Sequence, residues 1–276
     1  MISGTLRASD GVELYWREWP ATQPRRAVLV ILHGVGEHGG RYKSLAAGLG
    51  ARGIDCFVFD HRGHGRSTGP RGHVDCWDRY ESDVHEFLDE VVRDQLSTPF
   101  YLYGHSMGSL ICLKMAIGGF GREYHGFGGW VISGARIFPS GVAKRHLVVM
   151  ARLLSRIFPR LTMDLGIPST ALSHDQDIVD AYDDDPLVVR RATVRWGTEA
   201  LDTIKFIKRE ADRISDPMLL IHGSSDPLSE AYGSRWLAEQ VGGETDLIVY
   251  DGSLHEPHND PQYADVTGDV LRWIQR

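Results

Sequence analysis

The sequence predicts an α/β fold in which a mostly parallel central sheet is flanked by helices and carries a helical cap as an insertion. Short apolar runs bounded by Gly, Pro, Asp or His recur along the chain, and helical patterns lie between several of them. Short buried strands that alternate with helices are typical of a parallel sheet covered on both faces. One stretch of about 60 residues breaks this rhythm, and it is too long for a simple crossover loop.

Each core element follows from its residue pattern. Two alternating stretches at residues 2–7 and 13–19 predict a hairpin, because Ser9, Asp10 and Gly11 between them favour a turn. Further strands are expected at the short apolar runs 27–32, 56–59, 100–103, 129–132, 218–221 and 247–250. Helical periodicity predicts helices at residues 42–51, 80–92, 106–117, 229–240 and 263–274.

The stretch at residues 135–195 shows no clear strand, and its apolar residues recur at helical spacing. We therefore expect a helical cap there, with the α/β core formed by residues 1–134 and 196–276. Such a cap would cover the C-terminal edge of the sheet, which is where ligands bind in folds of this kind.

Composition narrows the class of protein. The 276 residues carry a net charge of −7, which gives no basic face for a nucleic-acid partner. The three cysteines, Cys56, Cys76 and Cys112, form no CxxC pair, so neither a zinc site nor a disulfide framework is expected. The first residues do not show the basic start and apolar run of a secretory signal. The default expectation is therefore a cytoplasmic protein, which contacts membranes only from outside.

The pattern GxSxG between a strand and a helix marks a nucleophilic serine, because the tight turn requires glycines on both sides. It occurs twice, around Ser67 and around Ser106. Ser67 lies in a polar, glycine-rich run before Pro70, with no strand or helix beside it. Ser106 follows a strand pattern and precedes an apolar helix, so we predict Ser106 as the nucleophile.

Two backbone N–H groups are expected to stabilise the oxyanion of the reaction. The helix that begins at Ser106 has free N–H groups and a positive dipole end, which predicts the Met107 N–H as one donor. The second is expected in the loop that follows residues 27–32, where glycines on both sides of Val35 let its N–H turn toward the serine.

The general base and the acid that orients it follow from chain order, which in this arrangement is Ser, then Asp or Glu, then His. His255 lies in a short loop after the last strand pattern and is the predicted base; His258 is the alternative, and His222 breaks the order. Asp226 follows the preceding strand and is the predicted acid, with Asp251 as its competitor. This Ser–His–Asp set needs no metal or organic cofactor.

Several motifs together resemble a known family. HGVGEH at residues 33–38, Arg41-Tyr42, DHRGHGRS at 60–67 and GHSMG at 104–108 look like the monoacylglycerol lipase and lysophospholipase group of the α/β-hydrolase superfamily. Tyr182 followed by DDDPL also resembles the cap of that group, and the resemblance runs from about residue 10 to the C-terminus.

The resemblance implies that a small lipid ester, monoacylglycerol, is hydrolysed to glycerol and a fatty acid. It also implies that Glu37, Arg41 and Tyr182 lie near the polar head of the substrate, and we add His105, beside the nucleophile, to these candidates. Alternatives remain open: a lysophospholipase or short-chain carboxylesterase with the same triad, a perhydrolase, or a non-catalytic ligand-binding protein on this fold.

The predicted cap contains one unusual helix at residues 146–158. Apolar residues dominate it, and Arg145, Arg152 and Arg156 fall on one side of a helical wheel. A broad apolar surface with a basic stripe could rest on a lipid interface, which predicts peripheral membrane contact. The competing interpretation is a helix packed on the core with its arginines in solvent.

Overall fold

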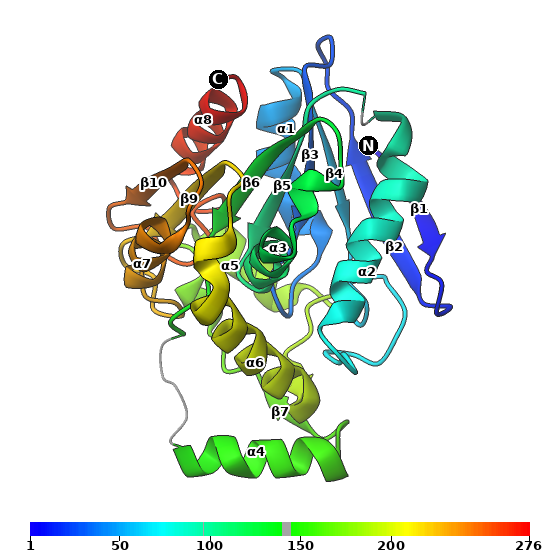
Figure 1. Cartoon of the computed structure of the whole chain (residues 1–276), viewed down its shortest axis with the longest axis vertical. Coiled ribbons are helices and arrows are strands. Elements are labelled where there is room, and N and C mark those ends of the chain that lie inside the picture. Colours follow the sequence, from blue (N-terminus) through cyan, green and yellow to red (C-terminus); the bar gives the residue numbers. More distant parts are fainter. Residues whose placement is uncertain (96, 140–144) are drawn as a thin grey trace.

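The computed structural model describes residues 1–95, 97–139 and 145–276, and Figure 1 shows its layers. Eight strands form the central sheet in the order β1-β2-β4-β3-β5-β6-β9-β10. Their bounds are β1 Ile2–Arg7, β2 Glu13–Trp19, β3 Ala27–Leu32, β4 Ile54–Phe59, β5 Phe100–His105, β6 Phe127–Ser133, β9 Met218–Gly223 and β10 Thr245–Tyr250. The β1–β2 and β2–β4 pairs are antiparallel, and all other pairs are parallel.

Apolar cores cover both faces of this sheet, because successive side chains of a strand point to opposite faces. Within β3, Val28, Val30 and Leu32 join one core, whereas Leu29 and Ile31 join the core on the other face. The core helices are α1 Lys43–Gly50, α2 Asp78–Phe87, α3 Met107–Gly118, α7 Tyr232–Gln240 and α8 Tyr263–Ile274. The predicted α/β class with a mostly parallel sheet is confirmed.

The insertion between β6 and β9 is built from α4 Arg145–Ile157, β7 Thr162–Asp164, α5 Gln176–Asp184, β8 Arg191–Thr193 and α6 Val194–Glu210. β7 and β8 pair antiparallel, so the expectation of no strand in this stretch is wrong. Three residues per strand are too few for a period of two to be visible in the sequence. Residue 195 lies within α6, and the division into core and cap at that residue stays a prediction.

Helix α4 lies at one end of the molecule, with α6 between it and α3 (Figure 1). Part of the predicted cap, residues 140–144, lies outside the described residues. Among the helices that the structure describes, none combines the length and apolar character needed to cross a bilayer.

A buried histidine cluster, His33, His61 and His64, lies where β3 and β4 end. The ring centroids of His33 and His61 are 4.3 Å apart; His33 donates from Nδ1 to Gly34 O and accepts at Nε2 from the N–H of His61. Burial lowers the pKa of all three rings, that of His64 to about 4, so the cluster is neutral near neutral pH.

Candidate active site

Ser106 lies at the turn between β5 and α3, and its backbone angles are φ 50° and ψ −108°. Within the described chain it is the one residue other than glycine with a positive φ. Backbone strain of this kind concentrates at functional sites. The flanking glycines are required by packing: a Cβ on Gly104 would lie 2.5 Å from Gly108 O, and one on Gly108 would lie 2.0 Å from Leu32 O.

The loop after β3 lies directly against this turn. A Cβ added to Gly34 would lie 2.8 Å from Glu37 Oε1 and 3.2 Å from Ser106 Cβ, so a larger residue would force these side chains to shift. Val35 and Ser106 line the same small cavity, and Met107 is the first residue of α3. Val35 therefore shares a cavity with the serine, and Met107 follows the serine directly with an N–H that has no partner within its helix.

Asp226 and His255 meet from the loops after β9 and β10. His255 Nδ1 lies 2.7 Å from Asp226 Oδ2, and both side chains are buried. Asp226 Oδ1 accepts hydrogen bonds from the N–H groups of Leu228 (2.8 Å) and Ser229 (3.0 Å). Burial alone would raise the pKa of Asp226, but the charge of His255 and the hydrogen bonds from the neighbouring histidines outweigh it and hold this pKa well below its usual value. His255 lines the same small cavity as Ser106.

The alternative serine and acid lie in settings unsuited to catalysis. Ser67 is buried, donates to the carbonyl of Asp60 and accepts from the N–H of Tyr15 at 2.8 Å, which ties its hydroxyl into the fold. Asp251 is exposed and accepts from Ser224 Oγ at 3.1 Å. Neither side chain lines the cavity that holds Ser106.

The alternative histidines have separate partners. His222 Nε2 lies 3.1 Å from Asp226 Oδ2, so this histidine contacts the acid, and it does not line the cavity that holds Ser106. His258 stacks on Tyr42 at 4.7 Å between ring centroids, and its Nδ1 lies 3.3 Å from Tyr103 OH. Burial lowers the pKa of His258 to about 3. Its ring is fully buried, and its contacts are with Tyr42 and Tyr103 and not with the serine.

A charge cluster of Glu37, Arg41 and Glu256 borders the catalytic cavity. Arg41 Nη2 lies 2.6 Å from Glu256 Oε2, and Arg41 Nε lies 3.3 Å from Glu37 Oε2. The cluster has two carboxyls for one guanidinium. Burial and then the charge of Glu256 raise the pKa of Glu37 to about 7, whereas the pKa of Glu256 is lowered because Arg41 outweighs the effect of burial.

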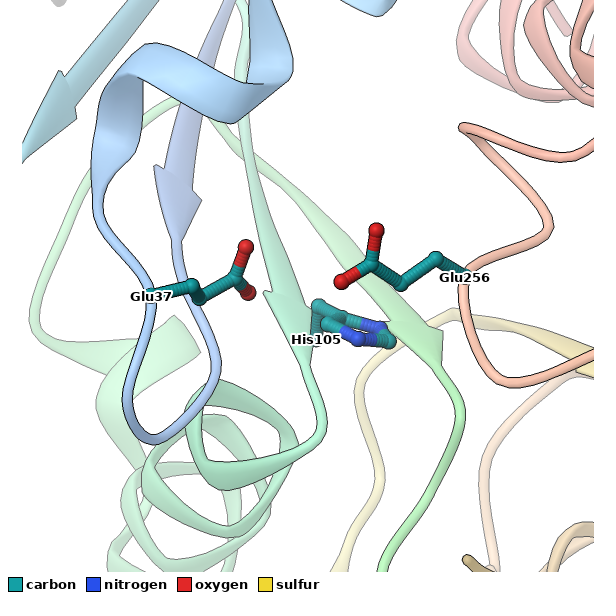
Figure 2. A group of neighbouring side chains, drawn as sticks. All are labelled: Glu37, His105 and Glu256. Atoms are coloured by element: carbon teal, nitrogen blue, oxygen red, sulfur yellow. The ribbon is translucent and has the colours of Figure 1, made fainter. Parts of the chain in front are cut away.

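Figure 2 shows Glu37 and Glu256 pointing toward one another, with His105 below them. These three residues offer ligand atoms within 4.8 Å of one another, which is the one potential metal-binding group in the described part of the chain. Arg41 already pairs with both carboxyls, and its positive charge fills the role that a cation would have. The group is therefore better explained as an ion-pair cluster than as a metal site.

The other predicted head-group residue, Tyr182, completes this side of the cavity. The Arg41 guanidinium lies 4.8 Å from the centre of the Tyr182 ring, in cation–π contact. The structure thus brings Glu37, Arg41, His105 and Tyr182 together beside Ser106. Sequence reasoning missed Glu256, although its position directly after His255 was a signal that it would reach the same cavity.

A larger apolar cavity of about 480 Å³ adjoins the catalytic one. Val35 and Ile167 line both, so the two spaces meet beside Val35, one of the two predicted oxyanion donors. Its walls come mainly from α4, β7, β8 and α6, including Leu147, Leu154, Met163, Trp196, Leu201 and Ile204. A space of this size and character suits a hydrocarbon chain.

The family described as serine aminopeptidase, S33, matches residues 23–262. The chain belongs to this family. A monoacylglycerol lipase of Mycolicibacterium smegmatis is 32% identical, covering 96% of this chain and 93% of that protein. A monoglyceride lipase of Mus musculus is 33% identical, covering 96% and 86%. The crystal structure of a Paleococcus ferrophilus monoacylglycerol lipase superposes with a TM-score of 0.80 at 30% identity, covering 95% and 98%.

Three predictions about this S33-family protein are confirmed by these comparisons. They are the resemblance to the monoacylglycerol lipase group, the α/β-hydrolase fold, and the enzyme class, a carboxylic ester hydrolase. The roles of individual residues are a separate matter, because the comparisons carry no residue assignments.

Proposed function

We propose that the protein hydrolyses monoacylglycerols to glycerol and fatty acid through an acyl-enzyme on Ser106. The observation that carries this proposal is the strained serine at the β5–α3 turn, which shares a buried cavity with a histidine bonded to Asp226. An activated serine requires a neighbouring base and an acid that orients the base, and we assign these roles to His255 and Asp226.

In the proposed reaction, His255 Nε2 takes the hydroxyl proton as Ser106 Oγ attacks the ester carbonyl. Asp226 holds the Nδ1–H of His255, which keeps Nε2 free to accept that proton. The N–H groups of Val35 and Met107 stabilise the oxyanion, and one such donor contributes roughly 3 kcal/mol. His255 then protonates the leaving alcohol, and water repeats the sequence to release the acid.

The two sides of the cavity support a substrate with a small polar head and an apolar tail. The 480 Å³ apolar cavity accommodates the acyl chain. On the other side, Glu256 Oε2 accepts from Arg41 and Asn259, while its second oxygen has no hydrogen-bond partner among the described residues. That oxygen can accept a hydrogen bond from a hydroxyl of the glycerol. The lipases among the relatives act on this class of ester by name.

The charge of the cluster argues against the lysophospholipase alternative. Two carboxyls face one guanidinium, and Arg41 is already paired with both. A substrate phosphate placed here would meet the negative charge of Glu256, while Arg41, the one guanidinium of the cluster, is already paired. A like-charge contact of this kind costs several kcal/mol. A neutral diol is the better match for this side of the cavity.

The test is a comparison of initial rates on monoacylglycerols, lysophospholipids and short p-nitrophenyl esters, with a fluorophosphonate probe to label the nucleophile. Ser106→Ala should abolish both turnover and labelling, while Ser67→Ala, the matched control from the second GxSxG, should keep the label. If short esters are hydrolysed best, the lipid assignment is wrong. If Ser106→Ala retains full activity, the nucleophile is wrong as well.

We also propose that α4 contacts membranes. The helix covers the apolar cavity with residues such as Leu154, yet Val149, Leu153 and Ile157 on its other side are each more than half exposed, at 67%, 57% and 57%. Arg156 and Arg160 are exposed nearby and favour anionic lipid. These exposures support the interfacial interpretation over a helix buried against the core.

The three free thiols also fit an enzyme that works in the reducing cytoplasm.

Vesicle flotation tests this contact. Leu153→Gln combined with Ile157→Gln should reduce retention on vesicles and turnover of lipid presented in them, while turnover of a soluble short ester stays unchanged. Leu153→Met with Ile157→Val is the matched control that keeps the apolar face. Equal retention of both pairs of variants would contradict the proposal.

A further inference from the structure

The apolar cavity has one cationic residue in its wall, Arg136. This residue lies three positions after the end of β6, and its backbone N–H donates to Ser109 Oγ at 3.4 Å, one turn of α3 beyond the proposed nucleophile. Most of the remaining wall consists of aliphatic and aromatic side chains, and Asp164 is the one acidic residue in it. A guanidinium in such surroundings needs an explanation, since nothing in the proposed ester hydrolysis uses it.

Arg136 has no counter-ion in the described part of the chain. Its buried Nη1 has no hydrogen-bond partner, and Asp226 is the one carboxylate of the described residues that influences its pKa. Asp226 acts on it electrostatically, but the oxygens of Asp226 are already taken by His255, His222 and two backbone N–H groups. Burial therefore lowers the pKa of Arg136 despite the opposing effect of Asp226.

An unpaired buried cation is costly, and the cost is removed when an anion with matching geometry binds. The planar guanidinium matches a carboxylate in particular, because two parallel N–H groups can donate to its two oxygens. The apolar walls around Arg136 select the rest of such a ligand, which must be a hydrocarbon chain. Both requirements are met by an aliphatic carboxylate.

We propose that Arg136 forms a carboxylate-binding subsite within the apolar cavity, which takes aliphatic carboxylates. Two sources supply this chemistry. One is the fatty acid released by hydrolysis, which would then act as a product inhibitor; the other is an ester whose acyl chain ends in a second carboxylate. Only the use of the cavity for acyl chains depends on the proposed function, because binding of a carboxylate requires no turnover.

Direct binding of dodecanoate, with dodecanol as the neutral ligand of equal length, tests the subsite. Calorimetry on wild type, Arg136→Leu and Arg136→Lys should show dodecanoate binding weakened about 10- to 100-fold by Arg136→Leu and by a smaller factor by Arg136→Lys, since hydrogen bonds to a charged group are lost. Dodecanol should bind all three alike. Equal dodecanoate affinity in wild type and Arg136→Leu would overturn the proposal, whether or not the protein hydrolyses monoacylglycerols.

The sources are separated by kinetics. A glycerol monoester of a long dicarboxylic acid should lose kcat/KM in Arg136→Leu if that chain end is bound, while the matched monocarboxylic ester should not. If Arg136→Leu loses inhibition by dodecanoate but keeps kcat/KM for both esters, the released fatty acid is the ligand. A purely structural role predicts that Arg136→Leu lowers Tm, whereas removal of an unpaired buried charge should leave Tm unchanged or raise it. A lowered Tm, with Arg136→Lys binding dodecanoate no better than Arg136→Leu, would refute the subsite.

Discussion

The hydrogen bonds around Asp226 make the consequence of Asp226→Asn unusually well defined. Oδ1 accepts from the N–H groups of Leu228 and Ser229, which can only be satisfied by an oxygen. The amide of an asparagine must therefore keep its oxygen at the Oδ1 position and place its NH2 where Oδ2 stood. That NH2 would donate toward His255 Nδ1, now 2.7 Å from Oδ2.

The donor at this position reverses the tautomer of His255. Nδ1 must accept from the asparagine, so the ring proton moves to Nε2, the atom that should take the proton of Ser106. In a Ser–His–Asp enzyme this change lowers kcat by roughly 10,000-fold while the geometry stays intact, which corresponds to about 5.5 kcal/mol of transition-state stabilisation. KM should change little, because the substituted side chain lies behind His255 and does not line the catalytic cavity.

The assay is steady-state kinetics of Asp226→Asn on a monoacylglycerol, with circular dichroism to verify the fold. Asp251→Asn is the matched control, since this exposed aspartate bonds only to Ser224 on its side chain and should stay within about twofold of wild type. An Asp226→Asn enzyme with activity within tenfold of wild type would refute the assignment of Asp226 as the orienting acid.

Three further predictions concern packing, pH and charge. Gly108→Ala would place a Cβ 2.0 Å from Leu32 O and should lower the free energy of unfolding in urea by more than about 2 kcal/mol, whereas Gly118→Ala, with open space around it, should be neutral or slightly stabilising. Burial lowers the pKa values of the histidine cluster, so below pH 6.5 the unfolded state binds more protons than the folded state. As the pH falls, the free energy of unfolding should therefore decrease by about 1.4 kcal/mol per pH unit for each ring. Groups such as Glu37, whose pKa is raised, partly offset this loss. Urea unfolding that is identical at pH 7 and pH 5 would contradict this. Glu256→Gln should raise kcat/KM for lysophospholipids relative to monoacylglycerols, and an unchanged ratio would exclude the charge argument.

The sheet and the strained serine could be predicted because their signals are local. A buried strand followed by GxSxG and an apolar helix is contained within about 20 residues, and the bounds of β5 and α3 agree with the prediction to within two residues. The base and acid followed from chain order combined with strand ends. The pattern-based prediction thus worked wherever one element determined the position of a functional residue.

The charge cluster could not be derived in the same way, because its pairing is set by tertiary structure. Arg41 and Glu256 are 215 positions apart, and they meet only because the loops after β3 and β10 both reach the C-terminal edge of the sheet. The sequence identified Arg41 through a family motif, but it gave no sign that Arg41 would be shared by two carboxyls. The strands β7 and β8 were missed for a related reason, since each consists of three residues that are defined by their partner.

Arg41 and Arg136, the two arginines beside the cavities, differ in whether the protein itself balances their charge. Arg41, on the polar side, has two carboxylate partners and a cation–π contact with Tyr182, so this side is electrostatically satisfied before any substrate binds. Arg136, on the apolar side, has no ion-pair partner among the described residues, and burial lowers its pKa despite the opposing charge of Asp226. A ligand with a neutral polar head suits the side of Arg41. A ligand that carries a negative charge suits the side of Arg136. Hydrolysis of a monoacylglycerol produces both kinds of molecule, the neutral glycerol and the anionic fatty acid, and each side of the cavity is chemically matched to one of them.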